Sequence, residues 1–189
     1  MTNTWETLFS NAWSDRADSA PIELQAWLSS RGSLTTKLTA ACQSGFKVQL
    51  LHQHLCFATE AAADALGLEC GAPLLHREVL LQDGDRPLVF ACSLLPEIAL
   101  NNQYEELRQL DERPLGHWIF AEPALTRARV CFAALSTQDN LFVRVPSLHQ
   151  ESPPCWGRVT YFQGAAAPLL VSEFFLDEGW AEANAPVSD

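Results

Sequence analysis

The sequence is poor in basic residues. Its 12 Lys and Arg side chains stand against 23 Asp and Glu, for a formal net charge of -11 over 189 residues. Phosphate backbones and anionic lipid headgroups repel such a chain, so nucleic acid and membrane surfaces are poor candidates as partners. Ten of the twelve basic residues are arginines, whose planar fork suits bidentate binding of a carboxylate. A small anionic ligand stays compatible with this composition, because a few well-placed arginines outweigh distant acidic groups.

Three further features are missing. No uninterrupted apolar run approaches the length that crosses a bilayer, so no membrane insertion is expected. Residues 1–6 lack the basic and apolar regions of a signal peptide. The six cysteines form no C-x-x-C pair and most lie in apolar runs, which is typical of reduced thiols. We therefore expect a cytoplasmic protein and, at this length, a single domain.

The most informative stretch is residues 74–82. Its aliphatic composition predicts a β-strand that ends at the turn signal Asp83-Gly84, and the apolar run 87–95 follows at once as its hairpin partner. Because side chains alternate between the faces of a strand, Arg77 lies on the apolar face of this one. A buried guanidinium is costly unless it meets an anion. That anion is either a carboxylate of the protein or one belonging to a ligand.

A second ionisable residue has a similar setting near the end of the chain. On the predicted strand 168–176, Glu173 shares a face with Leu169, Val171 and Phe175. Its carboxylate therefore loses water on folding and needs a partner. The sequence does not decide between a structural partner and a ligand.

Periodicity and turn residues predict the remaining elements. Residues 1–20 are expected to form an N-terminal extension, residues 21–176 the domain, and residues 177–189 a disordered acidic tail. Residues 136–155 are expected to form an irregular surface excursion. Helices are predicted at 21–28, 34–43, 59–66 and 101–110 and from Pro114 onward, and further strands at 46–57, 125–133 and 156–162.

His52 and His54 are candidate ligands of a metal ion. The two share a face of the predicted strand 46–57, a spacing that metal sites use. No neighbouring carboxylate or cysteine in the sequence completes a ligand set, so two partly exposed histidines are favoured and no metal is expected.

Five short motifs occur along the chain. They are H-R-E-V-L-L at 76–81, P-L-G at 114–116, L-T-R at 125–127, W-G-R at 156–158 and P-L-L-V-S-E-F-F-L at 168–176. Together with S-L-T at 33–35, they resemble the motifs of the bacterial chorismate pyruvate-lyase family. Each motif is weak alone, but their common order and similar spacing make the resemblance specific.

The resemblance implies an α+β fold. The expected architecture is a single domain with a six-stranded antiparallel sheet, helices covering one side and an internal ligand site. The implied reaction converts chorismate to 4-hydroxybenzoate and pyruvate, the first step of ubiquinone biosynthesis. The resemblance also implies no metal or organic cofactor, and we expect a monomer.

The resemblance assigns roles to four residues of this sequence. Arg77 is expected to bind the ring carboxylate, and Leu115 to contact the same end of the ligand. Glu173 is expected to meet the ring oxygen at the other end, and Leu34 of the early helical hairpin to close the site. Arg77 and Glu173 are thus the candidate catalytic residues.

One departure keeps an alternative open. The family often has an arginine on the second hairpin strand, where this chain has Ala91-Cys92-Ser93. The alternative is a non-catalytic domain of the same fold that binds a molecule like 4-hydroxybenzoate or senses an effector. Regulators with such domains usually carry a DNA-binding domain first, and roughly twenty residues before position 21 are too few for one.

Overall fold

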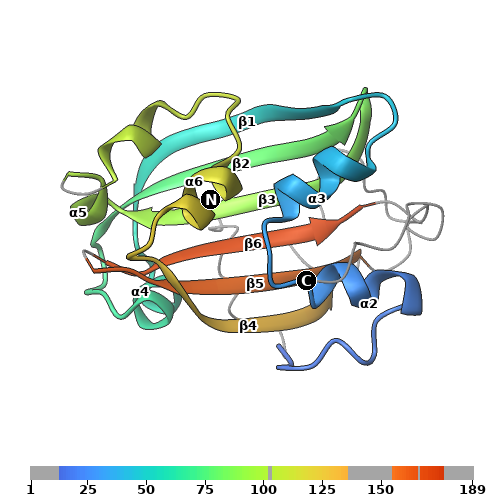
Figure 1. The fold of residues 1–189 in the computed structure, drawn as a ribbon. Helices are drawn as coiled ribbons and strands as arrows, with labels where there is room; N and C mark the ends of the chain where they lie inside the picture. Colours follow the sequence, from blue (N-terminus) through green and yellow to red (C-terminus); the bar gives the residue numbers. More distant parts are fainter. Residues whose placement is uncertain (1–12, 102–103, 136–154, 166, 177–189) are drawn as a thin grey trace.

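The protein is built on one antiparallel sheet (Figure 1). The computed structural model describes residues 13–101, 104–135, 155–165 and 167–176. The six strands follow the order β1-β2-β3-β6-β5-β4, and every neighbouring pair is antiparallel. The predicted α+β class and six-stranded sheet are therefore confirmed. The strands are β1 Phe46–Phe57, β2 Pro73–Asp83, β3 Arg86–Pro96, β4 Thr126–Leu135, β5 Cys155–Gln163 and β6 Leu169–Phe175.

Short helices connect and cover the strands. Helices α2, α3 and α6 lie over one face of the sheet (Figure 1). Ser33 caps α3 by accepting a hydrogen bond from the Thr36 N–H, and Thr59 caps α4 in the same way through Ala62. The helices are α2 Ile22–Leu28, α3 Leu34–Ala41, α4 Glu60–Leu66, α5 Glu97–Leu100 and α6 Leu115–Ala121, with a 3-10 helix, η1, at Glu105–Gln109.

The prediction of one helix over residues 101–110 is wrong. The chain forms α5, turns at Asn101 and continues as the 3-10 helix η1. The apolar residues of this stretch, Tyr104, Leu107 and Leu110, recur every three positions and all reach one core cluster. A 3-10 helix has three residues per turn, so it places such a series on one side, whereas an α-helix would spread it.

Both faces of the central strands are buried. Helix α4 packs against the face opposite α3 and α6, where its Ala62 and Leu66 join Leu80 and Phe174 in one cluster. Gly157 on β5 makes room for this packing, because a Cβ there would lie 2.3 Å from the Phe174 ring. The middle parts of strands β2, β3 and β6 are thus covered on both sides, and the charged side chains there, such as Arg77 and Glu78, are enclosed by protein.

Residues 13–20 pack on the domain. Ser14 forms a bridge with Phe132 of β4 through N–H···O bonds of 2.9 and 2.7 Å, and Ala17 is buried. The acidic tail 177–189 and most of the excursion, 136–154, lie outside the described residues, as do residues 1–12. All six cysteines are described and all are free thiols, as predicted. Among the described residues no helix has the length and apolar character of a membrane span.

Candidate functional site

A cavity lies between the sheet and the pair of helices α3 and α6. Its volume is about 50 Å³. That is several times what one water molecule requires, so a small organic molecule fits the site better than a macromolecule does. The structure brings all four predicted site residues together in its wall: Leu34, Arg77, Leu115 and Glu173.

Arg77 enters the cavity wall from the middle of β2. Its side chain is only 2% exposed, yet its hydrogen-bond partners are neutral. The guanidinium donates to Gln53 Oε1 at 2.9 Å and to the carbonyls of Asp111 at 2.6 Å and Arg113 at 3.2 Å. Burial lowers the pKa of Arg77 from its usual value, with a smaller opposing effect from the Asp111 charge. Arginine stays protonated in proteins, so Arg77 brings a full positive charge to the cavity wall. Within the described part of the chain, no carboxylate is hydrogen-bonded to its guanidinium.

A bulge in β1 provides one of these partners. The pairing of β1 with β2 shifts between Leu50 and His52, so that Gln53 lies opposite Arg77. Without the extra residue, strand alternation would turn the Gln53 side chain to the other face. The bulge also leaves His52 and His54 on a common face, as predicted, opposite Glu78 and His76.

Glu173 has a charged partner that sequence reasoning missed. Its Oε2 accepts a hydrogen bond of 2.5 Å from Arg158 Nε, and the two residues face each other across β5 and β6. Arg158 is 2% exposed and also lines the cavity. Its position in the W-G-R motif, in the middle of a predicted strand, was the signal that could have found it, because strand alternation alone places it on the face of Thr160.

Arg158 also joins the sheet to helix α2. Its Nη1 donates to the carbonyls of Trp27 at 3.3 Å, Leu28 at 3.1 Å and Ser30 at 3.0 Å. Arg127 of β4 donates to the same Ser30 carbonyl at 3.1 Å. A cation at the end of a helix satisfies carbonyls that have no partner in the helix itself. These two arginines therefore hold the α2–α3 connection against β4 and β5.

The small side chains of β3 leave the space in the centre. Ala91 and Ser93 line the cavity, whereas Cys92 between them points to the opposite face and packs in the core there. The departure noted at Ala91-Cys92-Ser93 therefore affects the cavity only through two small, uncharged residues. Strand β3 lies between β2 and β6, so these two strands are separated by two inter-strand spacings, about 10 Å. A single ring can therefore lie between Arg77 and Glu173.

Two helix starts close the cavity. Leu34 is the first residue of α3 and Leu115 the first of α6, and both line the cavity. The helices approach closely at Gly116, where a Cβ would lie 2.8 Å from Thr35 Oγ1 and 3.3 Å from Ser33 Oγ. The P-L-G and S-L-T motifs thus meet in space, and a ligand can pass this side only if the two helices separate.

The charges of the cavity wall define what it can hold. Arg77, Arg127, Arg158 and Glu173 line it, and most of the other lining residues are apolar. Neither His nor Cys occurs among the described lining residues. An excess of positive charge in a water-poor site favours a small anion. The arrangement offers a cation at one end, a hydrogen-bonding carboxylate at the other and an apolar slot between them.

The family profile and the curated relatives that match this sequence all point to the same family. The sequence profile described as chorismate lyase matches residues 8–184. A probable chorismate pyruvate-lyase of Methylococcus capsulatus is 37% identical over 153 residues, covering 81% of this chain and 94% of the relative. A probable chorismate pyruvate-lyase of Nitrosomonas europaea is 32% identical over 166 residues, covering 87% of this chain and 93% of the relative.

The solved structures with a similar fold are more distant in sequence. A GntR-family transcriptional regulator from Bacillus cereus superposes with a TM-score of 0.55 at 12% identity, over 70% of this chain and 92% of that one. The C-terminal domain of PhnF superposes with a TM-score of 0.55 at 18% identity, over 75% and 87% of the two chains. At such identities the likeness concerns the fold alone.

Proposed function

This chain belongs to the chorismate lyase family, and from that premise we propose that it is a chorismate pyruvate-lyase. It converts chorismate to 4-hydroxybenzoate and pyruvate inside the cavity under α3 and α6. The product is the aromatic precursor of ubiquinone, and the reaction is the first step of ubiquinone biosynthesis. The observation that carries the proposal is Arg77: a buried cation on the cavity wall whose described partners are all neutral.

The cavity charges suit this substrate. Chorismate carries two carboxylates, one on its ring and one on the enolpyruvyl group. Arg77 binds the ring carboxylate through its guanidinium, and Leu115 packs against the same end of the ring. The positive charge of Arg127 favours the second carboxylate, and Leu34 covers the bound ligand.

The reaction needs little from the protein beyond shape and exclusion of water. The bond between the ring and the enolpyruvyl oxygen breaks, and the neighbouring ring carbon loses its proton. The ring becomes aromatic, and the released enolpyruvate takes up a proton to become pyruvate. Because aromatisation supplies the driving force, a cavity that holds chorismate in a reactive conformation away from water accelerates the reaction.

Glu173 acts at the ring hydroxyl. Its carboxylate is 13% exposed and is held by Arg158 through Nε, so one of its oxygens has a set direction. A carboxylate in this position accepts the hydrogen bond of the hydroxyl and orients the ring. It also lies in reach of proton transfer at the same end, and the variant described in the Discussion separates the two roles.

The decisive experiment is a direct assay. Purified protein is incubated with chorismate in the presence of a chelator, and the aromatic absorbance of 4-hydroxybenzoate is followed beside pyruvate, with protein-free chorismate as the control. We expect equal amounts of the two products at a rate that scales with protein. If neither product exceeds the protein-free control, the lyase assignment is wrong.

A second candidate function rests on β3. Ala91 and Ser93 supply no cation where the family often has one. A chain with the cavity but without turnover would act as a binding or sensing domain for 4-hydroxybenzoate or a similar acid. Saturable binding of 4-hydroxybenzoate with no product from chorismate would favour this candidate, whereas product formation eliminates it.

A further inference from the structure

The opposite face of the same hairpin holds a second cluster of reactive side chains. Glu78 on β2 lies directly across from Cys92 on β3, and His76 is two residues from Glu78 on the same strand face. All three residues are 2% exposed. Arg77 points to the cavity between His76 and Glu78, so the hairpin carries the cavity on one side and this cluster on the other.

The three side chains converge on one point. His76 Nε2 lies 3.2 Å from Cys92 Sγ and 3.2 Å from Glu78 Oε1. The possible ligand atoms of all three lie within 4.8 Å of one another. With zinc bond lengths of about 2.0–2.3 Å, tetrahedral ligands are separated by about 3.3–3.6 Å. The observed separations are close to those of a coordination shell.

The chemistry of the three donors agrees with this geometry. An imidazole nitrogen carries either a hydrogen or a lone pair, so Nε2 cannot donate to the Glu78 carboxylate while it accepts from the Cys92 thiol. A divalent ion accepts electron pairs from all three at once. It also balances the negative charge of a buried carboxylate and thiolate. Imidazole with thiolate is a ligand set that favours Zn²⁺ over Mg²⁺ or Ca²⁺.

We propose that His76, Glu78 and Cys92 form a binding site for a single Zn²⁺ ion. The ion links β2 to β3 directly behind the strand segment that presents Arg77 to the cavity. Its role is to hold this pair of strands together, and it takes no part in the chemistry of the cavity. The inference stands independently of the proposed lyase activity.

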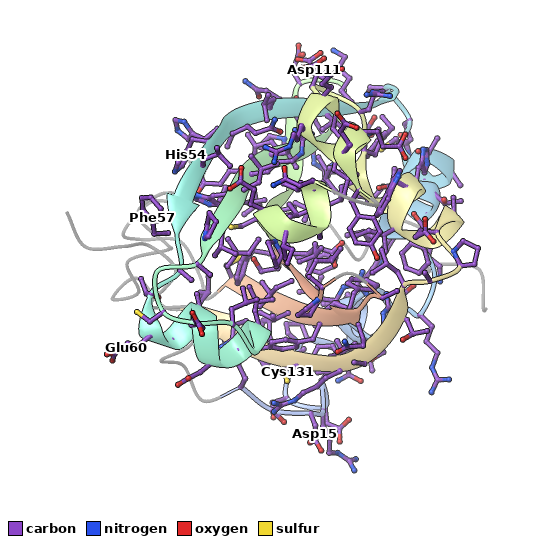
Figure 2. All side chains as sticks on the ribbon, turned by 90° about the vertical axis from the view of Figure 1, so that its left-hand side faces the viewer. Asp15, His54, Phe57, Glu60, Asp111 and Cys131 are labelled. Atoms are coloured by element: carbon purple, nitrogen blue, oxygen red, sulfur yellow. The ribbon has the colours of Figure 1, made fainter. Side chains whose placement is uncertain are left out.

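A neighbouring histidine offers the ion a route from solvent. The His54 ring meets the His76 ring edge-on at 5.0 Å between centroids. His54 is exposed on β1 and projects on the side of the sheet away from α3 and α6 (Figure 2). An incoming ion can thus be taken up at the surface close to the buried cluster.

The site is tested with Co²⁺, which replaces Zn²⁺ and reports thiolate coordination by a charge-transfer absorption band. Chelator-treated, reduced protein is titrated with Co²⁺, and Zn²⁺ is then added. We expect a band that saturates at one equivalent and is displaced by Zn²⁺. Added Zn²⁺ alone should also raise the melting temperature. A wild-type protein that shows no thiolate band and no thermal shift would overturn the proposal.

Matched variants locate the site. Cys92→Ala and His76→Gln should each weaken Co²⁺ binding at least tenfold, and Cys92→Ala should abolish the band. Cys131→Ala removes another buried thiol, on β4, and should keep the band. Glu173→Gln changes the cavity face and should keep it too. Near-ultraviolet circular dichroism checks that each variant is folded. A band that survives in Cys92→Ala but disappears in Cys131→Ala contradicts the assignment.

Discussion

Arg77 and Arg158 are two equally buried arginines in one cavity wall, each 2% exposed, and they differ in their partners. Arg77 donates to one side-chain amide and two backbone carbonyls. Arg158 donates to the Glu173 carboxylate and to the carbonyls at the end of α2. The first keeps its net charge available to a ligand, and the second is largely neutralised by the protein.

The different partners give the two arginines different roles, ligand binding for Arg77 and structural support for Arg158. Neutral acceptors hold a guanidinium in place without cancelling its charge, so Arg77 is oriented for an anion that comes from outside. Arg158 forms an ion pair and also donates to the carbonyls at the end of α2, which fixes the position of that helix. Arg158 therefore contributes mainly to the stability of the folded state. The same residue type therefore serves two purposes in one cavity, and removal of each should affect a different measurement.

The largest effect is expected for Arg158→Ala. It leaves the Glu173 carboxylate and the α2 carbonyls without their donor, which should lower the free energy of unfolding by about 3–5 kcal/mol. Urea denaturation measures the loss. Arg129→Ala, an exposed arginine over the Tyr161 ring, is the control and should cost less than about 1 kcal/mol. If both variants lose a similar free energy of unfolding, Arg158 does not have the structural role inferred here.

Arg77→Ala should instead abolish binding. With the cation gone, affinity for 4-hydroxybenzoate should fall on the order of 100-fold or more in calorimetry, equivalent to about 3 kcal/mol. Arg77→Lys should recover only part of it, because an ammonium lacks the bidentate fork. The protein should remain folded, since the neutral partners lose hydrogen bonds but no ion pair is broken. Unchanged affinity would reject Arg77 as the anchor.

Glu173→Gln sharpens the comparison at the other end of the cavity. The variant keeps the shape of the side chain and can still accept a hydrogen bond from Arg158, but it cannot take up a proton or form an ion pair. We expect product affinity within a few-fold of wild type, a lower melting temperature and a moderate loss of rate. A rate loss of about 100-fold or more with intact binding would assign proton transfer to Glu173. Lower stability with unchanged rate and affinity would make it a structural partner only.

The smallest effect concerns the two helices that close the cavity. If product release requires α3 and α6 to separate, a burst of about one product per site should precede steady turnover. Gly116→Ala forces a Cβ toward Thr35 Oγ1 and should loosen this contact, with a smaller burst and product affinity a few-fold lower. In a Thr35→Ala background the same substitution should reduce the burst and the product affinity less, because the effects of substitutions at two contacting residues are not additive. A linear trace from the first turnover of wild type would count against the closure.

Much of the fold followed from local patterns. The strand positions and the turn signal at Asp83-Gly84 depend on neighbouring residues, so the sequence was sufficient to predict them. Residues 101–110 were predicted wrongly because a series spaced by three fits a 3-10 helix better than an α-helix. Helix α5 escaped notice because four residues carry no periodic signal.

For the site, the sequence by itself determined that Arg77 and Glu173 face apolar surroundings, because alternation along a strand is a local property. Only the tertiary structure decided which partner each one meets. Arg158 reaches Glu173 through the register of β5 against β6, and Gln53 reaches Arg77 through the bulge in β1. Register and bulges depend on contacts between segments far apart in the chain, and no single stretch of sequence contains that information.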